Sequence, residues 1–172
     1  MPGDMPTQIY FLPKQGRWRG VLRFRVTNWR QFWATPMRWL ERLGVLSMAL
    51  LPKALGATWI ETTVDCARAE VVHTTQISKW GMVFFRSTER FALHDNGRDF
   101  TVRGEQRLWP TWRAEEYRDS HGQVDEAGAC ASYVFSVLGG VLRQRTEPAG
   151  EDLRAYQTTD WSHSEFLLRR VS

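Results

Sequence analysis

Turn signals recur about every 10 to 15 residues from residue 56 to the end of the chain, with no helical pattern between them. The intervening segments either alternate apolar with polar side chains or are rich in β-branched residues, as strands are. Asn96-Gly97 is the strongest short hairpin signal among these turns. The spacing predicts an antiparallel up-and-down meander of about nine or ten strands, counting a first strand before residue 27. Such a meander can close into a mainly β barrel around one small ligand.

The pattern also predicts where strands and turns lie. We expect strands at 18–26, 58–65, 69–78, 82–93, 99–108, 111–118, 129–138, 141–146, 153–159 and 163–171. Turns are expected at 95–98, 119–122 and 147–150, where Gly, Pro, Asn, Asp and Ser gather. Residues 1–15 contain three prolines and are expected to form an irregular lead-in.

An apolar helical insertion interrupts the β pattern at residues 28–55. Asn28 is placed to cap a helical turn that carries Trp29, Phe32 and Trp33 on one face. A second helix is expected to begin at Thr35-Pro36 and to stop at Gly44, and a third short helix is expected within 45–55. The insertion can serve as a fixed plug over one barrel end or as a lid over a ligand entrance.

The composition is typical of one soluble globular domain spanning residues 1–172. Hydrophobic residues make up 42% and charged residues 24% of the chain. The net charge of +4 comes mainly from arginines that are spread along the sequence, and this argues against a nucleic-acid-binding or membrane-binding tail. Nine Trp and nine Phe supply either a Trp-rich core or an aromatic-lined pocket.

Several further classes are disfavoured by missing motifs. Cys66 and Cys130 form no C-x-x-C motif and have no histidine at ligand spacing, so no metal is expected. No Gly-rich phosphate loop or dinucleotide fingerprint is present, so no cofactor is expected. No signal peptide is evident, and the most apolar stretch, residues 43–51, is too short to span a bilayer. We therefore expect a cytoplasmic protein. We also expect it to be a monomer or a homodimer.

Residues near the two ends of the chain predict how the barrel closes. Gly16 and Trp18 form a Gly-x-Trp triplet on the first strand, and Arg169 and Arg170 end the last strand. A Trp ring can seal one end of a barrel while a guanidinium stacks across it. This combination resembles the calycin group, which comprises lipocalins, fatty-acid-binding proteins and related bacterial barrels. The resemblance implies a closed barrel that holds a hydrophobic ligand. A half-open barrel wrapped on a helix, as in bacterial lipoprotein carriers, is the competing fold, because the 28–55 insertion replaces a simple lipocalin loop.

Polar residues on inward-facing apolar strand faces are the candidates for chemistry. His73 shares a face with Val71 and Ile77, where it is either a core histidine or an acid–base group. Glu89 is flanked by apolar neighbours, so it either pairs with an arginine of a neighbouring strand or exchanges protons in the cavity. Tyr133 can offer a phenol to a ligand. The candidate ligand-binding residues are Trp33, Phe85, Phe91, Trp109, Trp112, Phe135 and Tyr156.

These observations lead to three hypotheses for function. The first is a barrel that binds a small hydrophobic molecule, polycyclic or long-chain, in an aromatic cavity. The alternative is a cofactor-independent cyclase or isomerase of a polyketide-like or terpenoid-like intermediate, of the kind found in bacterial natural-product biosynthesis, with His73, Glu89 and Tyr133 as catalytic residues. A single-stranded nucleic-acid binder is the least favoured, because the arginines alternate with apolar residues as outward-facing strand positions do.

Overall fold

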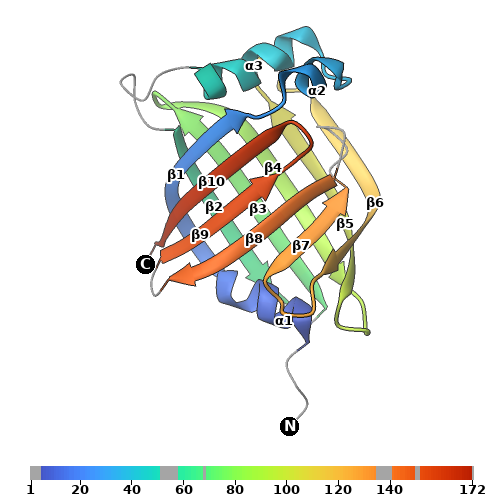
Figure 1. Ribbon diagram of the computed structural model, residues 1–172. Helices are drawn as coiled ribbons and strands as arrows, with labels where there is room; N and C mark the ends of the chain where they lie inside the picture. The colour runs from blue at the N-terminus through green and yellow to red at the C-terminus, as the bar shows by residue number, and fades with distance from the viewer. Residues whose placement is uncertain (1–4, 51–57, 68, 135–140, 150–151, 172) are drawn as a thin grey trace.

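The computed structural model describes residues 5–50, 58–67, 69–134, 141–149 and 152–171. Its strands form a closed antiparallel barrel in which each strand pairs with the next along the chain and the last pairs with the first (Figure 1). The ten strands are β1 Gly16–Val26, β2 Thr58–Cys66, β3 Glu70–Lys79, β4 Met82–Leu93, β5 Asp99–Leu108, β6 Ala114–Val124, β7 Cys130–Val134, β8 Val141–Ala149, β9 Asp152–Thr158 and β10 Ser162–Arg170. The predicted up-and-down barrel is confirmed.

Alternation along each strand separates the barrel interior from its surface. On β1, Trp18 and Leu22 are buried, whereas Arg17 and Arg19 are exposed and pair with Glu61 of β2. Because side chains of a strand alternate between the two faces of the sheet, this pattern requires one apolar and one charged face. The basic face predicted for the first strand therefore lies on the outside of the barrel.

The predicted turn at 119–122 is wrong and the one at 147–150 is misplaced, because strands occupy residues 119–122 and 147–149, while residue 150 lies outside the described residues. Residues 119–122 lie inside β6, and the chain turns instead at 125–129, where Asp125 Oδ1 accepts hydrogen bonds from the amides of Ala129 and Cys130. Gly122 is needed within the strand, because a Cβ there would collide with the buried Phe100 ring of β5. Residues 147–149 likewise belong to β8 and pair with β9.

The lead-in is also more ordered than predicted. Helix α1 (Pro6–Phe11) and a 3-10 helix (Leu12–Lys14) cover the end of the barrel at the bottom of Figure 1. Pro6 suits the first turn of α1, where its missing N–H needs no partner. Tyr10, Phe11 and Lys14 are buried and face the interior of the barrel. We call this segment, residues 6–14, the N-terminal plug.

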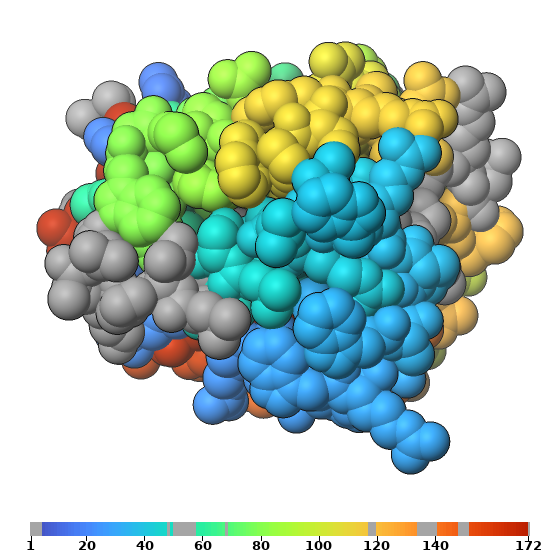
Figure 2. Space-filling view, turned by 90° about the horizontal axis from the view of Figure 1, so that it is seen from above, coloured from blue at the N-terminus to red at the C-terminus, as the bar shows by residue number. Residues whose placement is uncertain are grey.

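Two helices cover the opposite end of the barrel. Helix α2 (Trp29–Ala34) begins as predicted at Asn28, whose side chain accepts a hydrogen bond from the amide of Gln31. Helix α3 (Trp39–Leu50) starts later than expected and runs past Gly44. Gly44 does not end the helix but lets it approach the barrel, since a Cβ there would collide with the carbonyl oxygen of Trp109. Figure 2 shows α2, α3 and the residues after β5 lying over this end.

The start of β1 and the end of β10 meet at the plugged end of the barrel. The Arg170 guanidinium lies 4.8 Å from the Trp18 ring, and Gly16 lies beside it. Trp18 is buried, and its Nε1 donates a 2.7 Å hydrogen bond to the carbonyl of Lys14. Arg169 takes no part in this stack and pairs instead with Asp152 on the outer face. Among the described residues, no helix has the length and apolar character needed to cross a membrane.

Candidate functional site

A cavity of about 160 Å³ runs through the interior of the barrel. Its lining extends from Tyr10, Phe11 and Lys14 of the N-terminal plug to Val45 of α3, so both covers form part of its wall. Most of the remaining lining is apolar and comes from alternate residues of the strands. The cavity therefore has the apolar surface that ligand-binding sites in proteins share.

Aromatic rings make up the wall near the plug. Phe91 of β4 is at the centre of this group, with ring centroids of Phe11, Phe100 and Tyr133 at 5.2, 5.6 and 5.7 Å. The contacts are tilted or edge-to-face, which are the favourable arrangements for aromatic pairs. Three strands and the plug are thus held together by one buried aromatic cluster.

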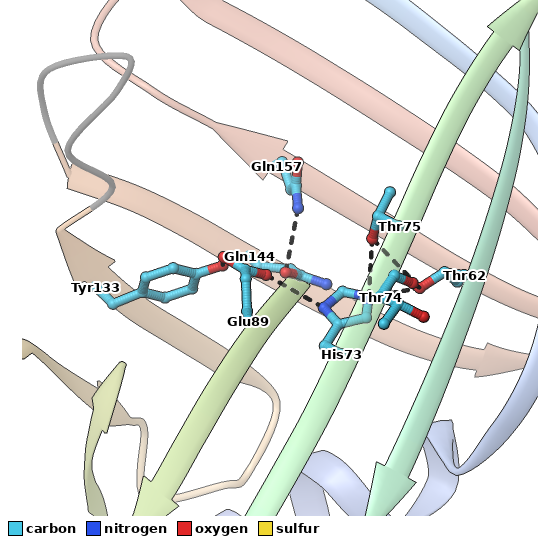
Figure 3. Close-up of polar contacts among 8 residues, drawn as sticks. All are labelled: Thr62, His73, Thr74, Thr75, Glu89, Tyr133, Gln144 and Gln157. Atoms are coloured by element: carbon cyan, nitrogen blue, oxygen red, sulfur yellow. Dashed lines mark hydrogen bonds and ion pairs between the residues drawn. The ribbon is translucent and has the colours of Figure 1, made fainter. Parts of the chain in front are cut away.

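The three predicted catalytic residues meet within the cavity lining. Tyr133 Oη donates a hydrogen bond to Glu89 Oε1 at 3.2 Å, and Glu89 Oε2 lies 3.3 Å from His73 Nδ1 (Figure 3). The other imidazole nitrogen, Nε2, lies 2.5 Å from Thr62 Oγ1 and 3.3 Å from Thr75 Oγ1. A continuous chain of polar atoms therefore joins the phenol, the carboxylate, the imidazole and two hydroxyl groups.

Strand register explains most of this arrangement. His73 and Glu89 are direct cross-strand partners on β3 and β4, and Thr62 and Thr75 are partners on β2 and β3. Tyr133 reaches the carboxylate from β7, which is not hydrogen-bonded to β4 in the sheet. Glu89 and Tyr133 are each only 4% exposed, so the carboxylate is satisfied by side chains rather than by bulk water.

Further polar groups line the cavity. Gln157 Nε2 of β9 donates a 3.2 Å hydrogen bond to Gln144 Oε1 of β8. Tyr10 Oη donates to the backbone carbonyl of Gln144 at 3.4 Å, and burial raises the pKa of this phenol, which therefore stays protonated. Gln106 Oε1 is buried and has no hydrogen-bond partner among the described residues. An acceptor in this state is suited to a ligand that donates a hydrogen bond.

The predicted ligand-binding residues divide into two groups. Phe85 and Phe91 line the cavity, whereas Trp33, Trp109, Trp112 and Tyr156 do not. Trp33 is 57% exposed on α2, and Trp109 packs its ring against Phe84 on the other side of β4. Tyr156 is out of phase with Leu153 and Ala155, which face inward from β9. Phe135 lies outside the described residues.

Sequence reasoning missed the contributions of the plug and of the threonines and glutamines. Thr62, Gln144 and Gln157 each alternate with buried apolar residues, so the two-residue period could have identified them. No such signal exists for Lys14, which lies in a short helix rather than in a strand.

Neither the two thiols nor the potential metal ligands of the described residues form a further site. Cys66 and Cys130 are free, and burial raises the pKa of each thiol. Within the described parts of the chain, no cluster of three His, Cys, Asp or Glu side chains is placed to bind a metal ion. Comparison with protein-family models, with curated proteins and with solved structures finds no match for this chain.

Proposed function

We propose that the protein binds one small, mainly apolar molecule in the barrel cavity and anchors the polar group of that molecule at Glu89, His73 and Tyr133. The observation that carries the proposal is the joined polar cluster on the wall of an otherwise apolar cavity. Ligand sites commonly combine a predominantly apolar lining with a few placed polar groups that orient the ligand. The proposed kinship with calycins is consistent with this function; it is supported by the closed barrel and by the stack of Arg170 on Trp18.

The size of the cavity narrows the ligand class. A dry engineered cavity of about 150 Å³ in another protein holds benzene. The present cavity, at about 160 Å³, has room for a compact ligand of similar size. A single substituted ring or a short branched chain fits this space better than the polycyclic or long-chain ligand expected from the aromatic content alone.

The polar groups of the cavity narrow the class of ligand further. Glu89 accepts hydrogen bonds, and Gln106 Oε1 is an acceptor with no described partner. A ligand with a hydroxyl group can donate to one of these acceptors, and this gives it an advantage over the corresponding hydrocarbon. We therefore expect benzyl alcohol to bind more tightly than toluene.

The test is a titration of both compounds followed by tryptophan fluorescence and calorimetry. Ala155 faces the cavity from β9, so Ala155→Trp should fill it and abolish binding, and Ala155→Leu should weaken binding in the same direction. Tyr156→Trp is the matched control, because the neighbouring residue does not line the cavity. Binding that is absent in the wild type, or equal in Ala155→Leu and Tyr156→Trp, would overturn the proposal.

A second candidate function is favoured by the Tyr133–Glu89–His73–Thr62 chain. A carboxylate 3.3 Å from an imidazole nitrogen, on the wall of a mainly apolar cavity, can remove a proton from one position of a ligand and return it to another. The cavity would hold the ligand in one reactive shape. This arrangement supports a cofactor-independent isomerase or cyclase. In that case Glu89→Gln and His73→Gln should keep most of the ligand affinity while turnover falls by about 100-fold or more.

A further inference from the structure

We propose that Lys14 binds aldehyde or ketone ligands covalently, by forming an imine with their carbonyl carbon inside the barrel cavity. This inference rests on the proposed function, because the ligand must first occupy the cavity. It adds the chemical class of the ligand and a second anchoring residue, Lys14, which belongs to the N-terminal plug rather than to a strand.

The position of Lys14 is fixed by its surroundings. Its carbonyl oxygen accepts the hydrogen bond of Trp18 Nε1, at the place where Arg170 stacks on the Trp18 ring. Its side chain turns inward and lines the cavity, with only 6% of the residue exposed. The Nζ atom lies 3.0 Å from the centroid of the Tyr10 ring and 5.7 Å from that of Phe11. The backbone of Lys14 is thus anchored where the barrel closes, and its amine lies against the Tyr10 ring at the cavity wall.

The described surroundings of this amine offer its charged form little support. Among the described residues, no carboxylate forms an ion pair with Lys14. The titratable groups that influence it are the thiols of Cys66 and Cys130, whose own pKa values are raised by burial, and the Tyr10 phenol lies beneath it. A ring face replaces only part of the hydration that burial removes.

Burial therefore lowers the pKa of the Lys14 amine well below its ordinary range. This shift favours the uncharged amine, whose lone pair can attack a carbonyl group, as amines of Schiff-base lysines do.

The use of lysine at this position stands out against the rest of the chain. Three of the 23 Lys and Arg residues are lysines: Lys14, Lys53 and Lys79. Lys79 is buried at the end of β3 but does not line the cavity, and Lys53 lies outside the described residues. An arginine in place of Lys14 would keep its charge and could not act as a nucleophile.

The reaction is balanced without an oxidant, a reductant or a metal. The amine lone pair forms a bond to the carbonyl carbon, and the carbonyl oxygen takes up the proton that the nitrogen loses. The carbinolamine then expels this oxygen as water while the nitrogen loses its second hydrogen as a proton, which leaves with the oxygen, and a C=N bond forms. The mainly apolar lining of the cavity disfavours the water that would hydrolyse such an imine.

The experiment uses benzaldehyde as the probe and benzyl alcohol as its matched non-electrophilic control. The full-length protein is incubated with benzaldehyde at neutral pH, reduced with cyanoborohydride and analysed by intact mass and peptide mapping. We expect one benzyl group per chain, on Lys14. The adduct should persist in Lys79→Met and disappear in Lys14→Met and in Lys14→Gln, with circular dichroism used to establish that each variant is folded.

Benzyl alcohol titrated in parallel separates this inference from the proposed function. Binding of the alcohol together with no benzaldehyde adduct would overturn the imine and leave the cavity as a reversible binding site. An adduct of equal yield in the folded Lys14 variants would also overturn it. Absence of binding of either compound would overturn the proposed function, and the imine with it.

Discussion

Replacing Lys14 with methionine should change how the stability of the protein depends on pH. The methionine keeps the length of the side chain and removes its titratable group. Lys14 is 6% exposed, lies against the Tyr10 ring and forms no ion pair with a described carboxylate. The folded protein therefore binds the lysine proton less tightly than the unfolded chain does, which is the basis of the expected effect.

The size of the effect follows from proton linkage. The folded pKa of Lys14 is lowered by burial, whereas the unfolded chain keeps the ordinary value of 10.5. Between these two values the unfolded chain binds one more proton than the folded protein. The free energy of unfolding of the wild type then rises by about 1.4 kcal/mol for each pH unit. The Lys14→Met variant lacks this contribution, so it should be the more stable protein at neutral pH, and its advantage should shrink by about 1.4 kcal/mol per unit as the pH rises.

Urea unfolding of both proteins, at several values between about pH 8 and pH 9.5, measures this difference. The thiols of Cys66 and Cys130 are present in both proteins, so their titration largely cancels. A stability difference that stays constant over this range would mean that the folded amine remains protonated. That result would refute both the linkage argument and the nucleophilic role of Lys14.

Three further predictions concern the core and the strands. Phe91→Ala removes the central ring of the aromatic cluster and should lower the free energy of unfolding by about 4 kcal/mol in urea titrations; a loss below about 1 kcal/mol would contradict that role. Burial and the nearby Glu41 charge raise the pKa of Glu115, so its ionised form is unfavourable in the folded protein. Glu115→Gln should therefore raise the free energy of unfolding at pH 7 by up to about 1 kcal/mol. This gain should vanish in thermal melts as the pH falls below the ordinary value of 4.5, and a gain that persists there would have another cause. Gly122→Ala forces a methyl group into the Phe100 ring and should cost about 2 kcal/mol, whereas an unchanged melting temperature would show that the ring moves aside without loss.

The barrel could be predicted because its determinants are local. Two-residue alternation on the strands that carry Glu89 and His73 separates inside from outside, and the hairpin at Asn96-Gly97 sets the connection between β4 and β5. The residues that share a strand face therefore follow from the sequence, whereas which face lies inward depends on the register of the assembled barrel. Once β3 and β4 pair through a short turn, the meeting of His73 with Glu89 follows from register.

The remaining features depend on contacts between distant residues. Gly122 resembles a turn residue, and only the Phe100 ring of the adjacent strand explains why it lies within β6. The sequence misplaces the end of α3 for the same reason: Gly44 allows the helix to contact Trp109 and does not terminate it. A glycine that is required for the close approach of two elements leaves no periodic signal in the sequence.

The plug illustrates this limit at the site itself. Residues 6–14 form a six-residue α-helix followed by a three-residue 3-10 helix, which are too short to show an amphipathic repeat. Their burial depends on the barrel end that they cover. The inward position of Lys14 could therefore be seen only in the assembled fold.

Native mass spectrometry of freshly purified protein tests the central claim most directly. The protein is measured intact, then denatured, and any released small molecule is identified. The account predicts one compact, mainly apolar molecule per chain, released from the wild type and absent from the cavity-filled Ala155→Trp variant. A mass equal to that of the bare chain, together with tryptophan fluorescence that no compact apolar compound alters, would contradict a ligand-binding cavity.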